Sequence, residues 1–148
     1  MIDWIELSPS PLSAATAVDF ATDPSAGGID LFLGTTRGEK NTAGKDLIAL
    51  DYEAYPEMAV GQMRDLAVRA RDQWPILKLV LLHRTGRVGV GEPSVVIAVS
   101  TAHRAASFEA CRWLIDKLKT EVAVWKKEVW ADGSTSWVDG HEIEPRQP

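Results

Sequence analysis

The order of apolar patterns along this 148-residue chain constrains its fold more than any other feature. Strongly β-rich runs stand at 76–83 (ILKLVLLH) and 94–100 (SVVIAVS), and alternating apolar residues predict a half-buried strand at 47–55. Helical patterns separate the strand pairs, so the predicted order is β-α-β-β-α-β-β-α-β-β. Adjacent strand pairs between helices favour an α+β fold with a mostly antiparallel sheet over a doubly wound parallel sheet.

Three main helices are expected from start signals and apolar spacing. The first begins at Ser10 and Pro11, the second opens at Pro56, and the third spans 103–119. The predicted buried stripe of the second helix comprises Ala59, Met63, Leu66, Ala70 and Trp74. The stripe of the third comprises Phe108, Cys111, Ile115 and Leu118.

The rest of the chain supplies further strands and two glycine-containing loops. Strands are expected at 2–7, 29–34 and 121–130, and an Asp-Gly turn within 131–138 predicts a short return strand. We interpret 35–46 (TTRGEKNTAGKD) and 84–93 (RTGRVGVGEP) as loops. No linker divides the sequence, so we predict a single domain over 1–148, with 140–148 as a mobile tail.

Charge and cysteine content exclude several classes of protein. The net charge of −5 and pI of about 5.2 disfavour a nucleic-acid or membrane-surface binder, so any anion site must be a local cluster. One cysteine, Cys111, allows no intramolecular disulfide and fits a reducing cytoplasm. No apolar run reaches the ~18 residues of a membrane span, and the acidic start MIDWIELSPS leads us to expect no signal peptide.

His103 and Arg104 form the first candidate anion site. With Ser100 or Thr101 as the expected cap, both cations lie in the first turn of the third helix, where the helix dipole disfavours them. Free amide groups together with Arg and His make a phosphate-binding corner. The alternative is a solvated helix start in which the unfavourable charge is screened.

Lys119, Lys126 and Lys127 surround the most apolar segment near the C-terminus, EVAVWKKEVW. Alternation along a strand places Lys126 on one face and Lys127 on the other. A lysine at the edge of a buried strand can act as a general acid or base. The alternative is that the three lysines are solvated ends of a helix and a strand.

Other residues give weaker signals. Arg37 follows a predicted strand at the start of a glycine-containing loop, where functional residues often lie, although a solubilising loop explains it equally. His83, His103 and His141 lack metal-ligand spacing, so we expect no metal site. Cys111 lies on the apolar stripe of its helix and is interpreted as a core residue.

Long ordered motifs resemble one family. HRTG at 83–86, the run 91–120 (GEPSVVIAVSTAHRAASFEACRWLIDKLKT) and VWKKE at 124–128 resemble the large, catalytic subunit of molybdopterin synthase. GTTRG at 34–38 and DYEAYPEMA at 51–59 also fit that family. The resemblance covers roughly 27–139, and residues 1–26 are less diagnostic.

The resemblance implies an activity and partners. Members of the family convert cyclic pyranopterin monophosphate into molybdopterin by installing two sulfurs as a dithiolene. The sulfur arrives as a thiocarboxylate on the C-terminal Gly-Gly of a small ubiquitin-like subunit. The large subunits form a homodimer with one small subunit at each end, and the fold is an α/β hammerhead. No cofactor is required, because molybdenum enters later in the pathway.

Matching the motifs assigns a role to seven residues by resemblance. Lys119 and Lys126 correspond to the catalytic lysines, while Lys127 and Glu128 complete the segment beside the pocket. Substrate binding is assigned to five residues, namely Arg37, His103, Arg104, Lys127 and Glu128, and the family contributes His103 and Arg104 across the dimer to the substrate phosphate. We therefore predict a cytoplasmic sulfurtransferase subunit. The alternative is a non-catalytic anion-binding or assembly homologue of the same fold.

Overall fold

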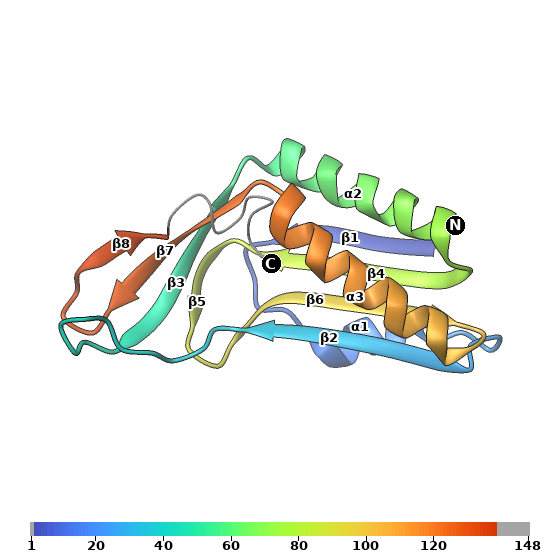
Figure 1. The fold of residues 1–148 in the computed structure, drawn as a ribbon, viewed down its shortest axis with the longest axis horizontal. Helices are drawn as coiled ribbons and strands as arrows, with labels where there is room; N and C mark the ends of the chain where they lie inside the picture. The colour runs from blue at the N-terminus through green and yellow to red at the C-terminus, as the bar shows by residue number, and fades with distance from the viewer. Residues whose placement is uncertain (1, 139–148) are drawn as a thin grey trace.

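Two four-stranded sheets form the framework of the protein in a computed structural model, which describes residues 2–138 (Figure 1). The strand order in the first sheet is β1 (Ile2–Ser8), β4 (Ile76–Arg84), β6 (Pro93–Thr101) and β2 (Gly28–Thr35). In the second sheet it is β5 (Gly86–Gly89), β3 (Leu47–Ala54), β7 (Val124–Trp130) and β8 (Thr135–Trp137). The predicted tail at 140–148 lies outside the described residues.

The strand pairing confirms the predicted α+β class. β1 pairs with β4 in parallel, whereas every other strand pair described in the two sheets is antiparallel. Three described helices connect strands along the chain: α1 (Ala14–Ala21), α2 (Pro56–Gln73) and α3 (Arg104–Glu121). α1 connects two strands of the first sheet, whereas α2 and α3 each connect one sheet to the other. The second sheet extends beyond one end of the first, and β5 bridges the gap between them (Figure 1).

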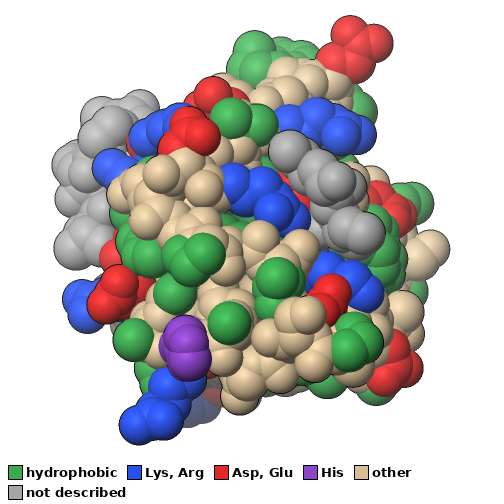
Figure 2. Space-filling model, turned by 90° about the vertical axis from the view of Figure 1, so that its right-hand side faces the viewer, with side chains coloured by type: hydrophobic (Ala, Val, Ile, Leu, Met, Phe, Trp, Pro, Cys, Tyr) green, Lys and Arg blue, Asp and Glu red, His purple; other side chains and the backbone are tan. Residues whose placement is uncertain are grey.

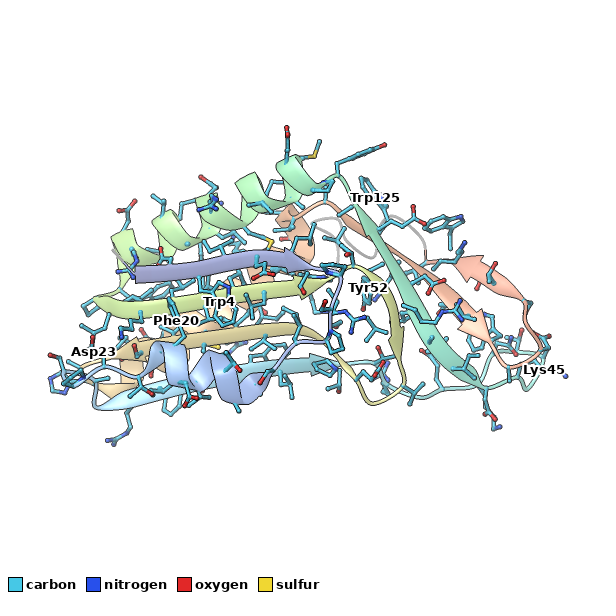
Figure 3. All side chains as sticks on the ribbon, turned by 180° about the vertical axis from the view of Figure 1, so that it is seen from behind. Trp4, Phe20, Asp23, Lys45, Tyr52 and Trp125 are labelled. Carbon is cyan, nitrogen blue, oxygen red and sulfur yellow. The ribbon has the colours of Figure 1, made fainter. Side chains whose placement is uncertain are left out.

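The helices cover opposite faces of the first sheet. α2 and α3 pack on one face, and their buried side chains share a core with residues of both sheets, including Leu50, Met63 and Leu114. α1 covers the other face, where Trp4 and Phe20 pack at the margin of a smaller core (Figure 3). Since the larger core contains residues of β3 and β7 as well as β4 and β6, the two sheets belong to one hydrophobic unit.

The structure corrects the predicted helix starts. α1 is capped by Ser13, whose hydroxyl accepts a hydrogen bond from the backbone N–H of Thr16 at 3.1 Å. Ser10 instead donates its backbone N–H to the hydroxyl of Ser8, which also donates to the carbonyl of Ser10. The N-cap of α3 is His103, because Ser100 and Thr101 belong to β6.

Three further predictions were wrong in detail. The segment 84–93 is not only a loop, because it contains the short strand β5. Ile48, which the alternation over 47–55 places on the predicted apolar face, is instead 46% exposed, since a bulge between Leu47 and Ala49 shifts the alternation at the start of β3. Phe108 is 56% exposed, although the other predicted stripe residues of α3 are buried.

Gly27 and Gly28 allow α3 to begin close to the start of β2. A Cβ atom on Gly27 would overlap the carbonyl oxygen of Ala102, and one on Gly28 would lie 3.2 Å from the Cα of Arg104. At Gly27 only glycine permits this approach of two backbones, whereas a side chain at Gly28 would require the start of α3 to shift by a few tenths of an ångström. The N-terminus of α3 is therefore fixed against the first residues of the edge strand β2.

Candidate functional site

A small pocket lies between the C-terminal half of α3 and the second sheet. Its volume is about 50 Å³. The apolar part of its lining comprises Val95, Ile115, Leu118, Val122 and Val124. The polar part comprises Tyr52, His83, Ser94, Lys119 and Lys126. The structure therefore brings together the two lysines that the sequence analysis selected as catalytic candidates.

The register of β3 and β7 places Lys126 in this pocket. Lys126 lies directly opposite Tyr52, and neighbouring strand residues point to opposite faces. Lys126 and Glu128 therefore share the inner face. Lys127 points to the outer face, where its ammonium nitrogen lies 5.1 Å from the centre of the Trp137 ring. The structure does not bring Lys127 into the pocket.

Lys119 comes from the last turn of α3. This helix continues to Glu121, and its buried residues Ile115 and Leu118 hold the last turns against the core. A lysine near a helix C-terminus also complements the helix dipole. Lys119 is an exposed residue that lines the pocket, so it lies on the solvent side of that pocket.

His83 and Tyr52 are the buried titratable residues that line the pocket, and His83 has 6% of its surface exposed. Burial is the main cause that lowers the pKa of its imidazole to about 4, and the charges of Lys119 and Lys126 act in the same direction. Its Nδ1 lies 2.8 Å from the carbonyl oxygen of Arg84. His83 is therefore neutral at neutral pH.

Sequence reasoning weighed His83 as a metal ligand and used it in the HRTG motif, but it missed the place of His83 in the pocket. The signal that could have revealed it is its position at the end of the strand run 76–83. There the alternation that buries Leu79 and Leu81 continues to residue 83 and puts a polar ring on the core side of the strand. The Tyr52 ring meets this imidazole edge-on, with 5.1 Å between the ring centres.

Arg37 is not among the residues that line the pocket. The Ser94 hydroxyl donates a hydrogen bond to the carbonyl of Gly34 at 3.3 Å, which ties the end of β2 to the pocket. The backbone N–H of Thr36 then donates to the carbonyl of Glu92 at 3.1 Å. These contacts fix the chain on the N-terminal side of Arg37, whose side chain is exposed.

His103 and Arg104 lie at the other end of α3. With a rise of 1.5 Å per residue, about 22 Å of helix separates Arg104 from Lys119. Both side chains are exposed and border a separate surface hollow with Gly27. In Figure 2, which views the right-hand side of Figure 1, positive and negative side chains are interspersed over the surface. Because of the separation along α3, one chain does not bring His103 and Arg104 to its own lysine pocket.

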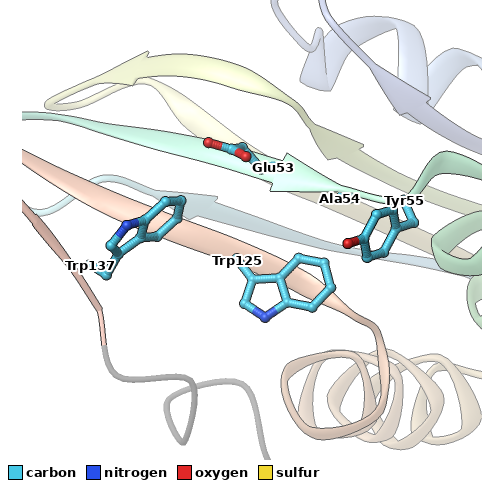
Figure 4. Close-up of a pocket in the computed structure, with 5 residues that line it drawn as sticks. All are labelled: Glu53, Ala54, Tyr55, Trp125 and Trp137. Atoms are coloured by element: carbon cyan, nitrogen blue, oxygen red, sulfur yellow. The ribbon is translucent and has the colours of Figure 1, made fainter.

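An aromatic cleft on the outer face of the second sheet was not predicted. Glu53, Ala54, Tyr55, Trp125 and Trp137 line this cleft, which has a volume of about 320 Å³ (Figure 4). The rings of Tyr55 and Trp125 meet edge-to-face with 5.4 Å between their centres. Strand alternation could have placed Glu53 and Trp125 on one face, but only the register shows that they are directly opposite each other.

Other candidate chemistries find no support in the part of the chain that the structure describes. Within residues 2–138, no group of three His, Cys, Asp or Glu side chains is arranged to hold a metal ion. No described helix is both long and apolar enough to cross a membrane. Cys111 is buried, as predicted, and burial raises the pKa of its thiol well above the usual range.

Comparisons with known proteins were made for the sequence and for the structure. The family model described as "MoaE protein" matches residues 7–121. The molybdopterin synthase catalytic subunit of Bos taurus is 44% identical over 135 residues, which cover 91% of this chain and 70% of the relative.

Solved structures show the same fold. Molybdopterin synthase from Staphylococcus aureus aligns with a TM-score of 0.82 and 29% identity over 90% of this chain and 96% of that chain. A complex of subunits 1 and 2 of molybdopterin-converting factor from Helicobacter pylori aligns with a TM-score of 0.76 and 17% identity. That alignment covers 94% of this chain and 91% of the other, and at this identity it shows the fold alone.

Proposed function

The chain belongs to the MoaE family of molybdopterin synthase catalytic subunits, and we propose that it transfers sulfur at the pocket that contains Lys119 and Lys126. It is accordingly a sulfurtransferase subunit of molybdenum cofactor biosynthesis. We assign the transfer to this pocket because the two lysines meet there. The described lining residues include no carboxylate that would neutralise the two lysines. Such a pocket is suited to an anionic reactant.

The proposed reaction joins two anions. The substrate is cyclic pyranopterin monophosphate, and the sulfur donor is the thiocarboxylate at the C-terminal Gly-Gly of a small ubiquitin-like subunit. Two ammonium groups reduce the repulsion between these anions. A lysine can also protonate a leaving oxygen or stabilise an oxyanion. The apolar lining strengthens these interactions because it lowers the local dielectric constant.

Further residues have supporting roles in this proposal. Arg37, His103 and Arg104 bind the substrate phosphate, because their cationic donors match phosphate oxygens. Glu128 shares the strand face of Lys126 and lies beside the pocket. Lys127 points to the opposite face of β7, so we assign it no direct contact with the substrate.

A small partner subunit is part of the proposal. The support for it is family membership, since the small subunit supplies the sulfur in this family, and the Helicobacter pylori structure with the same fold was solved as a complex of two subunits. The end of the partner chain must reach Lys119, which lies on the solvent side of the pocket. In this proposal the partner supplies the sulfur, so the buried Cys111 has no part in the transfer.

A second copy of the chain completes the phosphate site. His103 and Arg104 lie about 22 Å of helix away from the lysines of their own chain. They lie instead beside Gly27 and Gly28 at the start of β2, whereas Arg37 follows the end of that strand. Antiparallel pairing of β2 with its copy would place the start of one strand beside the end of the other.

The exposed face of β2 is self-complementary in this pairing. β2 is an edge strand, and its exposed apolar side chains are Ile29 (37%), Leu31 (36%) and Leu33 (40%). If Leu31 pairs with Leu31 of the second copy, Ile29 meets Leu33 in both directions, as two-fold symmetry requires. The same register brings Gly27 opposite Thr35, so His103 and Arg104 approach Arg37 of the second copy.

Single-turnover product formation tests the function. Wild-type protein is mixed with thiocarboxylated small subunit and cyclic pyranopterin monophosphate, and the dithiolene product is measured. We expect Lys119→Ala and Lys126→Ala each to reduce the rate by roughly 10²-fold or more, because general acid–base and electrostatic contributions are of this size.

Lys127→Ala is the matched control, since it removes a neighbouring lysine from the outer face of the same strand. Its rate should stay within about threefold of wild type, as expected for an exposed charge away from the reacting groups. If folded wild-type protein binds the small subunit but forms no product, the catalytic proposal is wrong and an assembly role is favoured. Equal losses in Lys126→Ala and Lys127→Ala would remove the assignment to the pocket.

A further inference from the structure

His83 is the pocket residue that neither the motifs nor the family comparison assigns to a role. Its ring is buried against Tyr52 and faces the cavity that Lys119 and Lys126 also line. The side chains around it come from four elements: Tyr52 from β3, Ser94 from β6, Lys119 from α3 and Lys126 from β7. A buried imidazole beside two cations needs a specific reason to be there.

The hydrogen bond to Arg84 determines which ring nitrogen carries the proton. A carbonyl oxygen can only accept, so Nδ1, 2.8 Å from the Arg84 carbonyl, must be the donor. In the neutral ring the lone pair is then on Nε2. Among the described side chains that line the pocket, this nitrogen is the acceptor that cannot also donate, because Tyr52 and Ser94 carry hydroxyl groups and the lysines only donate.

Because the ring is neutral, this nitrogen can accept a hydrogen bond without reducing the positive charge of the pocket. Burial and the two lysine charges keep His83 neutral at physiological pH. A carboxylate in the same place would also accept hydrogen bonds from lysine, but its negative charge would cancel the positive potential that attracts anionic reactants. A neutral acceptor orients an ammonium group and leaves its charge intact.

We propose that His83 is a positioning residue for sulfur transfer, and that its Nε2 accepts a hydrogen bond from the lysine pair and directs the ammonium groups toward the reacting anions. This role rests on the proposed function of the pocket. His83 acts through Lys119 and Lys126 and does not itself attack or protonate the substrate. Removing an acceptor for a charged donor should slow the reaction by roughly ten- to a hundredfold.

Two amide variants separate the two ring nitrogens. His83→Asn carries its amide near the position of Nδ1 and can preserve donation to Arg84, but it cannot reach the position of Nε2. His83→Gln extends to the position of Nε2 and can present a carbonyl oxygen there. We expect single-turnover rates at least about tenfold lower than wild type for His83→Asn and within about threefold for His83→Gln. Affinity for the small subunit should be the same in both variants.

Nitrogen NMR of the wild-type protein supplies a readout that does not depend on any variant folding. Labelled histidine should show a neutral His83 ring with the proton on Nδ1 at pH 7 and still neutral at pH 5.5. In Lys126→Ala the loss of one nearby cation should allow the ring to protonate at higher pH. A proton on Nε2, or a charged ring at pH 7, would overturn the proposal.

The kinetic outcomes distinguish this proposal from the function of the site. If the lysine variants lose activity but His83→Asn and His83→Gln have equal rates, the positioning role is wrong and the lysine assignment stands. If the wild-type protein forms no product, the proposed function fails, and the role of His83 in sulfur transfer fails with it. Rescue by Gln together with the Nδ1–H tautomer supports the positioning role.

Discussion

The two ends of α3 carry cationic residues in very different surroundings. At the C-terminal end, Lys119 lines a small pocket that strands of both sheets complete. At the N-terminal end, His103 and Arg104 are exposed beside Gly27, and the His103 side chain makes no capping hydrogen bond. The difference teaches that the fold gathers the cations at one end of the helix into a pocket and leaves those at the other end exposed to solvent.

The largest expected effect is the recovery of activity when two impaired variants, one from each end of α3, are combined in one dimer. Lys126→Ala should lose roughly 10²-fold in single-turnover rate and Arg104→Ala roughly tenfold or more. In a mixed dimer, one site collects both substitutions and the other collects neither. Random assembly makes half of the dimers mixed, so co-expressed, differently tagged copies should recover about a quarter of wild-type activity. Activity equal to the mean of the two separate variants would show that each chain uses only its own residues.

The buried imidazole of His83 should make the stability of the protein depend on pH. The pKa of His83 is about 4 in the folded protein and 6.5 in the reference state, so the unfolded chain binds more protons between these values. Stability is then complete above pH 6.5 and falls as pH decreases toward 4. Between pH 7 and pH 5 the expected loss is about 2 kcal/mol, or roughly 30-fold in the folding constant.

Urea unfolding at the two pH values measures this effect. In His83→Gln the loss between pH 7 and pH 5 should be smaller by about the same 2 kcal/mol, since glutamine does not titrate. His103→Gln is the matched control for the substitution itself, because it replaces an exposed histidine outside the pocket. An unchanged pH dependence in His83→Gln would show that the ring does not titrate as described.

A substitution on β2 should disrupt the proposed dimer without changing the lysine pocket or the residues at the start of α3. Leu31→Lys places a charge at the centre of the proposed symmetric contact, so we expect monomers in analytical ultracentrifugation and a rate about tenfold lower. Ile48→Lys is the control, because Ile48 is also exposed and apolar but lies in β3. A Leu31→Lys protein that remains dimeric would exclude this face as the interface.

Substitutions on the exposed surface in the middle of α3 should have the smallest effect on stability and on the reaction rate. Arg112 and Asp116 form an exposed pair with 3.8 Å between the closest charged atoms. Exposed pairs at this spacing stabilise a helix by only a few tenths of a kcal/mol. Arg112→Ala should therefore change the free energy of unfolding by less than about 0.5 kcal/mol in thermal or urea unfolding, with no change in rate. A larger effect would show that the exposed face of α3 has a role that its contacts do not reveal.

Much of the fold followed from local patterns in the sequence. The apolar stripe that includes Ala59, Met63 and Leu66 is buried as expected, because helical spacing alone puts these residues on one side. Phe108 shares the spacing of its helix but is exposed, since α3 packs on the sheet only over the remaining stripe. The bulge near Ile48 was not predictable from alternation, because it depends on how β3 pairs with β7.

The candidate site was less predictable than the fold. Strand alternation correctly separated Lys126 from Lys127, because a period of two is a local property. The convergence of Lys119, Lys126 and His83 depends on three elements that meet only in the folded chain. The motifs suggested the lysines by family resemblance, but no local pattern indicated that a neutral imidazole lies beside them.

Gly27 and Gly28 limit which substitutions the protein can tolerate during evolution. Every codon change that replaces glycine adds at least a Cβ atom, and at Gly27 that atom would overlap the carbonyl of Ala102. Selection can therefore exchange many residues on the outer surface of α3, but it has almost no alternatives at this joint. A lineage that lost Gly27 would have to move the start of α3, and with it His103 and Arg104.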